Sequence, residues 1–140
     1  MVDDHPALAI DLGDARIGIA ATDDMGIMAH PVETIQREKV DPIERIAQLV
    51  EERKVRTLIL GLPLHSDGSE GDAAAKARAF GEQLSARLPE LPLHFIDESF
   101  TTLSAAGKLR EAGRKAKQQK AVIDQAAAVE ILNSWLDLHP

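Results

Sequence analysis

Three acidic residues that lie far apart in the chain stand where the sequence pattern places carboxylates beside buried structure. Asp11 directly follows the apolar run 7–10, and Glu98 lies just beyond the predicted core strand 93–96. Asp124 shares a helical face with apolar residues of the C-terminal region. A buried carboxylate is costly unless it is hydrogen-bonded, paired or bound to a metal. Each of these residues therefore needs a chemical explanation.

The donor set predicts a site for Mg²⁺ or Mn²⁺, with two ions expected. Carboxylate oxygens are the ligands that these ions prefer, whereas the chain has no cysteine and its 5 histidines are scattered. Two such ions about 3.5–4 Å apart would activate water and stabilise the leaving oxygen in phosphodiester hydrolysis. We expect Asp11, on a central strand, to bridge both ions.

Structural explanations of the same carboxylates stay open at this point. Asp11 could cap the turn that follows its strand. Asp124 could complement the helix dipole, because the spacing places it in the first turn of the last helix. That explanation suits an outward-facing carboxylate better than an inward-facing one.

The elements that position these residues follow from turn signals and hydrophobic periodicity. A β-hairpin is predicted from residues 7 to 22, through Gly13-Asp14, and an edge-like third strand over 32–37. We then expect a helix from 42 to about 53, a strand over 57–61, a helix over 72–88, a strand over 93–96, a helix from 101 or 102 to about 112, and a last helix over about 121–138.

This order predicts an α/β fold in one domain spanning residues 1–140. The sheet is mixed, with a three-stranded meander followed by alternating helices and strands, and helices cover both of its faces. Sites in such folds form outside the carboxyl ends of the strands, which is where Asp11 and Glu98 stand.

Composition narrows the class of protein. The chain has 44% hydrophobic and 28% charged residues, no apolar run long enough to span a membrane, and an acidic, polar N-terminus unlike a secretory signal. We therefore expect a cytoplasmic protein without membrane attachment. A net charge of −7 argues against a nucleic-acid binder held by bulk positive charge.

One basic segment contrasts with this acidic body. Residues 108–120 carry 6 basic residues against one acidic residue. We expect Arg114, Lys115, Lys117 and Lys120 to contact the phosphate backbone of a nucleic acid, although a solvated helix end is the commoner origin of such runs.

The loop over residues 62–71 is predicted to contact substrate. It is rich in turn-forming residues, and it follows a buried strand that is expected to end near the site. Its candidate residues are Pro63, Asp67, Gly68 and Gly71, to which Thr101 and Thr102, beyond Glu98, are added. A long surface connection is the alternative.

Four motifs in order resemble the YqgF (RuvX) family, whose members are described as Holliday junction resolvases or as nucleases that mature the 5′ end of pre-16S ribosomal RNA. The resemblance spans about residues 7–136. It rests on Ile10-Asp11-Leu12-Gly13 with Arg16-Ile17-Gly18, Gly61-Leu62-Pro63-Leu64 with Asp67-Gly68-Ser69-Glu70-Gly71, Asp97-Glu98 with Thr101-Thr102, and Asp124 with Ala126-Ala127 and Ile131-Leu132. It implies a ribonuclease H-like fold and a nuclease whose catalytic, metal-binding residues are Asp11, Glu98 and Asp124.

The chain departs from the family pattern at one place. Ser99-Phe100 stands where the family usually has Arg-Leu. The missing arginine removes a phosphate contact, and we expect Arg16 or the basic segment to supply it.

Two other classes of function stay open. One is a non-catalytic RNA- or ribosome-binding module that keeps the fold. The other is a nucleotide-binding domain of the actin and sugar-kinase superfamily, which also begins with an Asp-x-Gly hairpin, although no second such hairpin follows here. For a nuclease, the substrate is either branched DNA or a ribosomal RNA precursor. A junction-cleaving enzyme is expected to act as a homodimer, because a four-way junction has two symmetric scissile strands.

Overall fold

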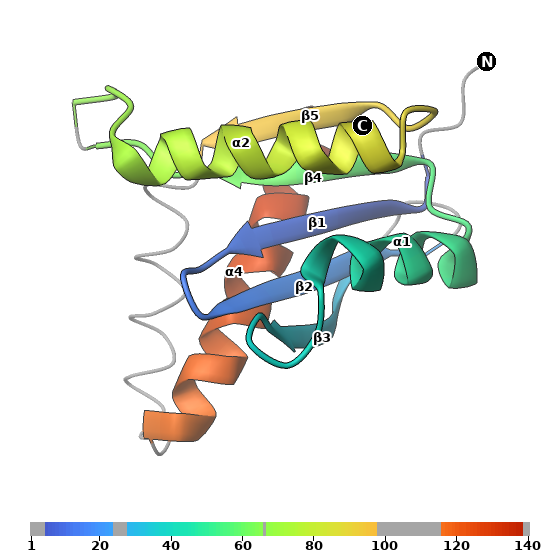
Figure 1. Ribbon diagram of the computed structural model, residues 1–140, viewed down its shortest axis with the longest axis horizontal. Coiled ribbons are helices and arrows are strands. Elements are labelled where there is room, and N and C mark those ends of the chain that lie inside the picture. Colours follow the sequence, from blue (N-terminus) through green and yellow to red (C-terminus); the bar gives the residue numbers. More distant parts are fainter. Residues whose placement is uncertain (1–4, 24–27, 66, 98–115, 139–140) are drawn as a thin grey trace.

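A mixed sheet of 5 strands forms the centre of the fold, in the order β3-β2-β1-β4-β5 (Figure 1). The computed structural model describes residues 5–23, 28–65, 67–97 and 116–138, and in the last helix the side chains of residues 125–137. Its elements are β1 (Ala7–Leu12), β2 (Arg16–Thr22), β3 (Ala29–Gln36), α1 (Pro42–Arg53), β4 (Thr57–Leu62), α2 (Asp72–Arg87), β5 (Leu93–Asp97) and α4 (Ala116–Leu138).

β1 is the central strand, as expected. It pairs antiparallel with β2 and parallel with β4, which in turn pairs parallel with β5. Its residues 7–10 are fully buried on both faces, which explains their uniformly apolar character. The two edge strands are β3, at the end of the meander, and β5, at the end of the parallel part.

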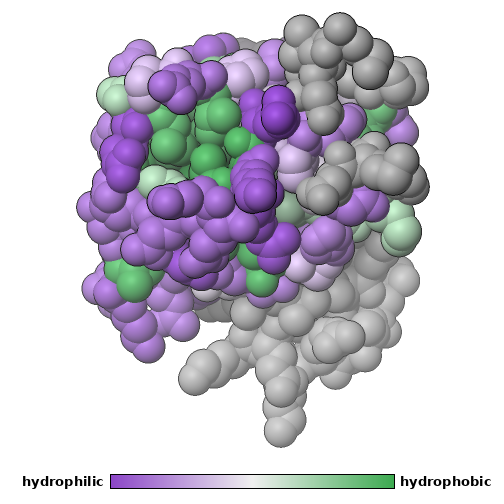
Figure 2. Space-filling view, turned by 90° about the vertical axis from the view of Figure 1, so that its right-hand side faces the viewer, coloured by the Kyte–Doolittle hydropathy of each residue, from purple (hydrophilic) through white to green (hydrophobic). Residues whose placement is uncertain are grey.

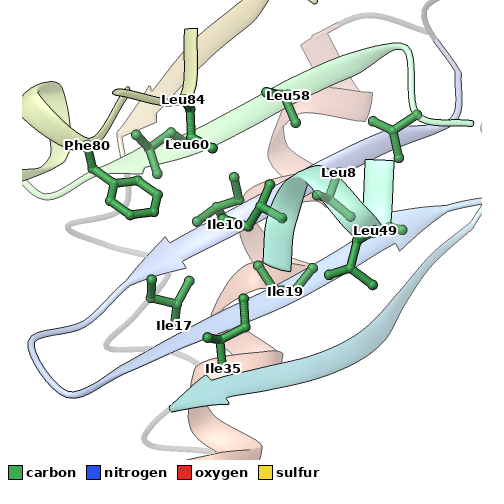
Figure 3. Close-up of a cluster of buried hydrophobic side chains, with 13 residues drawn as sticks. Leu8, Ile10, Ile17, Ile19, Ile35, Leu49, Leu58, Leu60, Phe80 and Leu84 are labelled. Carbon is green, nitrogen blue, oxygen red and sulfur yellow. The ribbon is translucent and has the colours of Figure 1, made fainter. Parts of the chain in front are cut away.

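Helices cover both faces of the sheet, so the predicted fold class is confirmed. α1 and α2 lie on one face and α4 crosses the other (Figure 1). Between the sheet and α1/α2, the alternate residues of each strand form the larger core (Figure 3), which contains Leu8, Ile10, Ile17, Ile19, Ile35, Leu49, Leu58, Leu60, Phe80 and Leu84. The α4 side is built from smaller strand residues, with Ala7, Ala9, Ala20 and Ile59 packed on Ala128, Ile131, Leu132 and Trp135.

The first helix begins as its sequence signals predict. The Asp41 carboxylate accepts a hydrogen bond of 3.0 Å from the backbone N–H of Ile43, and Pro42 occupies the first turn. Lys54 ends the helix in the left-handed conformation, at φ 55°.

The start of the last helix differs from the prediction. α4 already includes Ala116, whereas the pattern suggested a start near residue 121. Residues 116–120 are alanine, lysine and glutamine, which are all good helix formers. The helix can therefore begin within the basic segment instead of after it. The predicted helix from 101 or 102 to about 112 lies outside the described residues.

The third strand also begins earlier than predicted, at Ala29 instead of residue 32. Its pairing with β2 shifts register between Ile19 and Ala20, and Pro31 lies opposite Ala20. A proline is accommodated there because β3 is an edge strand and the ladder is irregular at this point.

The amino ends of β1, β4 and β5 face the viewer in Figure 2, which shows a mostly hydrophilic surface with a recessed hydrophobic area. Half-buried leucines that connect α2 to β5 lie at this end, namely Leu88, Leu91 and Leu93. None of the helices in the described part of the chain is long and apolar enough to cross a membrane.

Candidate active site

The carboxyl ends of three parallel strands meet at one edge of the sheet (Figure 1). β1 ends at Leu12, β4 at Leu62 and β5 at Asp97. Open α/β sheets bind ligands at this edge, because the loops that leave the strands there converge. Asp11 lies at this edge, one residue before the end of the central strand.

The side chain of Asp11 lies on the α4 face of the sheet. Asp11 pairs with Gly18, and Gly18 pairs with Thr34, so the three residues form one rung and share a face. The Thr34 hydroxyl accepts a hydrogen bond of 3.0 Å from Nε2 of Gln125 in α4, which identifies that face. Asp11 is half-buried there, in line with Ala7 and Ala9 of the same strand, which pack against α4.

Glycine stands on both sides of Asp11 within the sheet. Gly18 is opposite on β2, and on β4 Gly61 follows Leu60, the partner of Ile10. The position directly opposite Asp11 on β2 therefore carries no Cβ.

The turn after Asp11 is closed by main-chain atoms. The N–H of Gly13 donates to the carbonyl of Arg16 at 2.9 Å, and a Cβ at position 13 would lie 2.5 Å from that same oxygen. The turn therefore requires glycine. A main-chain hydrogen bond closes it, and the alternative that Asp11 also caps this turn stays a prediction.

Arg37 holds the same turn from the end of β3. Its Nη1 donates to the Gly13 carbonyl at 2.9 Å, and its backbone N–H donates to Ala15 O at 3.1 Å. Its guanidinium carbon lies 5.9 Å from the centroid of the Phe80 ring. The sequence analysis did not identify Arg37, because only the register of β3 brings this residue to the turn.

A pocket of about 400 Å³ lies beside the turn on the α1/α2 face, with Leu12, Phe80 and Lys76 among its lining residues. Lys76 and Asp14 approach to 3.4 Å across it, and both are largely exposed. Because the Asp11 carboxylate lies on the other face of the sheet, we do not assign the predicted chemistry to this pocket.

At the end of β5, the two adjacent acidic residues differ in their placement. Asp97 pairs with Leu62, whose side chain packs with Ala74 and Ala77 of α2, so Asp97 belongs to the α2 face. Ile96, one residue earlier, packs on the α4 side. Glu98, the predicted site residue, lies outside the described residues.

Asp124 lies deeper in its helix than predicted. With α4 including Ala116, residue 124 stands at least eight positions from the start and not in the first turn. The helix-dipole explanation thereby loses its basis, because that effect is confined to the terminal turn. Position 124 is one turn before Ala127 and Ala128, both fully buried, and adjacent to Gln125, which contacts β3.

The predicted nucleic-acid-binding residues are partly described. Arg16 is the first residue of β2 and is half-buried at the candidate edge. Lys117 and Lys120 lie within α4, which corrects the expectation that the basic segment precedes the last helix. Arg114 and Lys115 lie outside the described residues.

The predicted substrate loop forms a small folded turn. The Asp67 carboxylate accepts hydrogen bonds from the backbone N–H and hydroxyl of Ser69, at 2.9 and 2.6 Å. These bonds hold the pKa of Asp67 below its usual value. Gly68 adopts φ +86°, and the exposed His65 ring packs on Gly71, so a side chain at position 71 would require the ring to move. Pro63 is half-buried, and Thr101 and Thr102 lie outside the described residues.

The loop is also attached to α2. Glu70 accepts two hydrogen bonds from Arg78, at 2.6 and 2.7 Å, and the Arg78 guanidinium lies 5.1 Å from the centroid of the Phe95 ring. The pair lowers the pKa of Glu70. The internal bonds give Gly68, Gly71 and Asp67 structural roles, and whether the loop contacts substrate stays a prediction.

Comparison with protein families shows to which family the chain belongs. Residues 5–138 match the family model of RuvX, described as Holliday junction resolvase. The chain belongs to the RuvX family. The predicted resemblance is thereby confirmed over nearly the whole sequence.

Relatives of the chain carry a second description. A protein of Nocardia farcinica is 47% identical over 137 residues, covering 93% of this chain and 76% of the relative. A protein of Streptomyces avermitilis is 47% identical over 131 residues, covering 93% and 84%. Both are named "Putative pre-16S rRNA nuclease". The RuvX family and its relatives are thus described as nucleases.

Solved structures show the fold of this RuvX-family chain. Thermus thermophilus RuvC aligns with a TM-score of 0.53 at 13% identity, covering 94% of this chain and 96% of that chain. T. thermophilus RuvC in complex with Holliday junction substrate aligns with a TM-score of 0.56 at 16% identity, covering 95% and 96%. The fold is therefore ribonuclease H-like, as the resemblance implied.

The described residues fit a divalent-metal site in the RuvX-family chain only in part. Asp11 supplies a half-buried oxygen donor at the strand edge, on the face crossed by the helix that carries Asp124. Carboxylate donors suit Mg²⁺ or Mn²⁺. Within the described ranges, no group of three or more histidine, aspartate or glutamate side chains could hold a metal. The predicted cluster needs Glu98 and the side chain of Asp124, which those ranges leave out.

Proposed function

We propose that the chain is a divalent-metal-dependent endonuclease that hydrolyses phosphodiester bonds of structured nucleic acid. The observation that carries the proposal is the rung Asp11–Gly18–Thr34 and its contact to α4. It sets Asp11 on the face crossed by the helix that bears Asp124, and Gln125 bonds to the end of the same rung. Membership of a family of nucleases supports the same reaction.

In this proposal the carboxylates of Asp11, Glu98 and Asp124 hold the metal. Two divalent ions, when bound, lower the pKa of the attacking water and stabilise charge on the leaving oxygen. Asp11, on the central strand, would be the ligand shared by both ions. Glu98 would contribute a second carboxylate from the segment that directly follows β5.

Basic side chains orient the nucleic acid toward these carboxylates. Arg16 stands at the strand edge, and the segment with Arg114, Lys115, Lys117 and Lys120 leads into or lies in α4. Their role is to hold phosphates and thereby fix the position of the scissile bond, without reading sequence.

For the substrate, we place a ribosomal RNA precursor first and a four-way DNA junction second. Relatives 44–47% identical to this chain are named for pre-16S ribosomal RNA, whereas the family description names the Holliday junction. A junction resolvase would act as a dimer, since it cuts two symmetric strands.

The test is cleavage by the purified protein with Mg²⁺ or Mn²⁺ and an EDTA control. A 5′-extended precursor of 16S ribosomal RNA and a mobile four-way DNA junction are compared side by side, with Asp11→Asn as the control for contaminating nucleases. Cleavage that needs metal and is lost in Asp11→Asn is the expected result. Cleavage of the precursor alone indicates ribosomal RNA maturation, and paired nicks in the junction indicate resolution.

Three results would contradict the proposal. An Asp11→Asn protein that cleaves like the wild type would show the site assignment to be wrong. A wild-type protein that binds the precursor but cleaves neither substrate would favour the non-catalytic RNA-binding module. The phosphotransferase alternative would be favoured by ATP binding without cleavage.

A further inference from the structure

The inference concerns Thr34, which the sequence analysis did not single out. Thr34 lies on the edge strand β3, two strands away from Asp11 along the same rung. Neighbouring strands are about 4.8 Å apart, so its backbone lies about 10 Å from that of Asp11. Its hydroxyl oxygen accepts a hydrogen bond of 3.0 Å from Nε2 of Gln125. This part-buried contact joins two residues that are 91 positions apart in the sequence.

This contact constrains the backbone of α4 at Gln125, the neighbour of Asp124. Consecutive residues of a helix differ by about 100° of rotation and about 1.5 Å of rise. A constraint on the backbone position of residue 125 is therefore also a constraint on that of residue 124. The packing that follows along α4 is apolar, with Ala127, Ala128, Ile131, Leu132 and Trp135 buried. The hydrogen bond at Gln125 adds a directional constraint to this packing at the end of the described packing nearest Asp124.

Catalytic carboxylates need such a constraint, because productive geometry tolerates errors of only about 0.5 Å and 10–20°. We propose that Thr34 is a positioning residue: its hydroxyl, through Gln125, fixes the backbone of α4 at Asp124, on the face of the sheet that carries Asp11. This inference rests on the proposed function insofar as it treats Asp124 as a metal ligand.

The adjacent residue Glu33 offers a matched control. It points to the opposite face of β3, where it pairs with Arg45 of α1. A Glu33→Gln variant weakens the attachment of the same strand without touching α4. A loss caused only by destabilising β3 would therefore appear in both variants.

The experiment measures Mn²⁺ affinity by calorimetry in the absence of nucleic acid. The variants are Thr34→Val, which keeps the β-branched shape without the hydroxyl, Thr34→Ser, which keeps the hydroxyl, and the control Glu33→Gln. Asp124→Asn gives the reference for loss of the ligand. Cleavage by the same proteins is measured at saturating and subsaturating substrate to separate kcat from KM.

We expect Thr34→Val to weaken Mn²⁺ binding about 10-fold, the lower end of what removing a residue that orients a ligand costs. We expect kcat to fall and KM to change less than about twofold, since the phosphate-binding residues are untouched. Thr34→Ser restores both values toward wild type, and Glu33→Gln leaves the Mn²⁺ affinity unchanged.

The inference is overturned if Thr34→Val binds Mn²⁺ as tightly as wild type, or if Glu33→Gln loses as much affinity. It is also overturned if Asp124→Asn keeps full affinity, because Asp124 is then no ligand. These readouts are separate from the proposed function: a wild-type protein that binds Mn²⁺ but cleaves no substrate contradicts the nuclease, and the affinity of Thr34→Val still decides the role of Thr34.

Discussion

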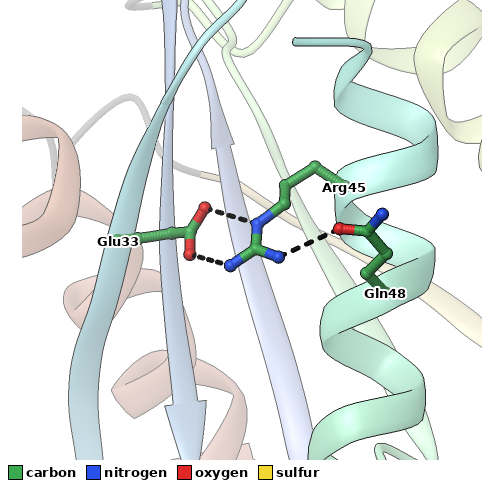
Figure 4. Close-up of polar contacts among 3 residues, drawn as sticks. All are labelled: Glu33, Arg45 and Gln48. Carbon is green, nitrogen blue, oxygen red and sulfur yellow. Dashed lines mark hydrogen bonds and ion pairs between the residues drawn. The ribbon is translucent and has the colours of Figure 1, made fainter.

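Arg45 of α1 donates two hydrogen bonds to the carboxylate of Glu33 on β3, from Nε at 2.9 Å and from Nη2 at 2.7 Å (Figure 4). Its remaining Nη1 donates to Gln48 at 3.0 Å. The hydrogen bond to Glu33 raises the pKa of Arg45. Because Thr34 bonds to α4 on the other face, adjacent residues of one edge strand attach helices to both sides of the sheet.

The first prediction tests this attachment. Arg45→Lys is expected to lower the free energy of unfolding by about 1 kcal/mol, because a lysine ammonium cannot reproduce the two-bond geometry of a part-buried pair. The measurement is urea denaturation. Arg87→Lys is the matched control, since Arg87 pairs with Glu44 in the same way on a more exposed surface. An equal loss in both variants would show that the burial of the Arg45 pair contributes nothing.

A second prediction separates the two acidic residues at the end of β5. Glu98→Gln is expected to reduce cleavage by at least ~10²-fold, the order lost when one charge-stabilising group leaves an active site. Asp97→Asn is expected to retain most activity per folded molecule, because Asp97 belongs to the α2 face. The measurement is the initial rate of cleavage by both variants at saturating metal. The opposite order of effects would transfer the site role to Asp97.

A third prediction concerns the lysines of α4. Replacing Lys117 and Lys120 together with glutamine is expected to weaken nucleic-acid binding and to flatten the plot of log K against log[salt]. The slope should fall by ~0.9 per lysine for duplex and ~0.7 for single strands. Arg53→Gln, a charge change at the far end of α1, serves as control. An unchanged slope in the double variant would assign these lysines to a solvated surface.

A fourth prediction tests the turn that follows Asp11. Gly13→Ala is expected to reduce cleavage more than it reduces stability, because the new Cβ would lie 2.5 Å from Arg16 O and must displace the backbone that carries Asp11. Gly81→Ala provides the contrast. Its Cβ would press on Phe95 at 3.0 Å in the α2 layer, so stability should fall by about 1–3 kcal/mol while the activity of the folded protein persists. Thermal melts and cleavage rates are measured on both.

The fifth prediction is a pH dependence in the 62–71 loop. The Ser69 hydroxyl is the main cause of the lowered pKa of Asp67, followed by the Ser69 backbone N–H. Ser69→Ala should therefore raise that pKa without restoring it fully. Because the folded pKa lies below the unfolded one, the stabilisation is complete above the unfolded value and disappears as pH falls through the folded value. NMR titration of the Asp67 carboxyl checks this, and an unchanged midpoint would contradict it.

Much of the fold could be predicted because its signals are local. The run 7–10 is apolar on both faces, and Asp41-Pro42 marks the start of α1, so β1 and α1 are found where the pattern placed them. The inner face of α2 likewise followed from spacing, with Ala74, Ala77, Phe80 and Leu84 buried.

The rest depends on contacts that no local pattern encodes. Thr34 and Gln125 are 91 positions apart, and their hydrogen bond needs both the β2–β3 register and the rotation of α4. The start of α4 lies before the predicted one, because the alanine, lysine and glutamine residues at 116–120 all favour a helix. Arg37 reaches Gly13 across a strand pairing, which the sequence does not specify.

The crossing of α4 over the sheet has a consequence for synthesis. α4 covers Ala7, Ala9, Ala20 and Ile59, and it follows the five strands of the sheet in the chain. Until α4 docks, that face of the sheet is bare. A nascent chain is therefore unable to assemble the proposed site before α4 has been synthesised, although the strand that carries Asp11 is made long before.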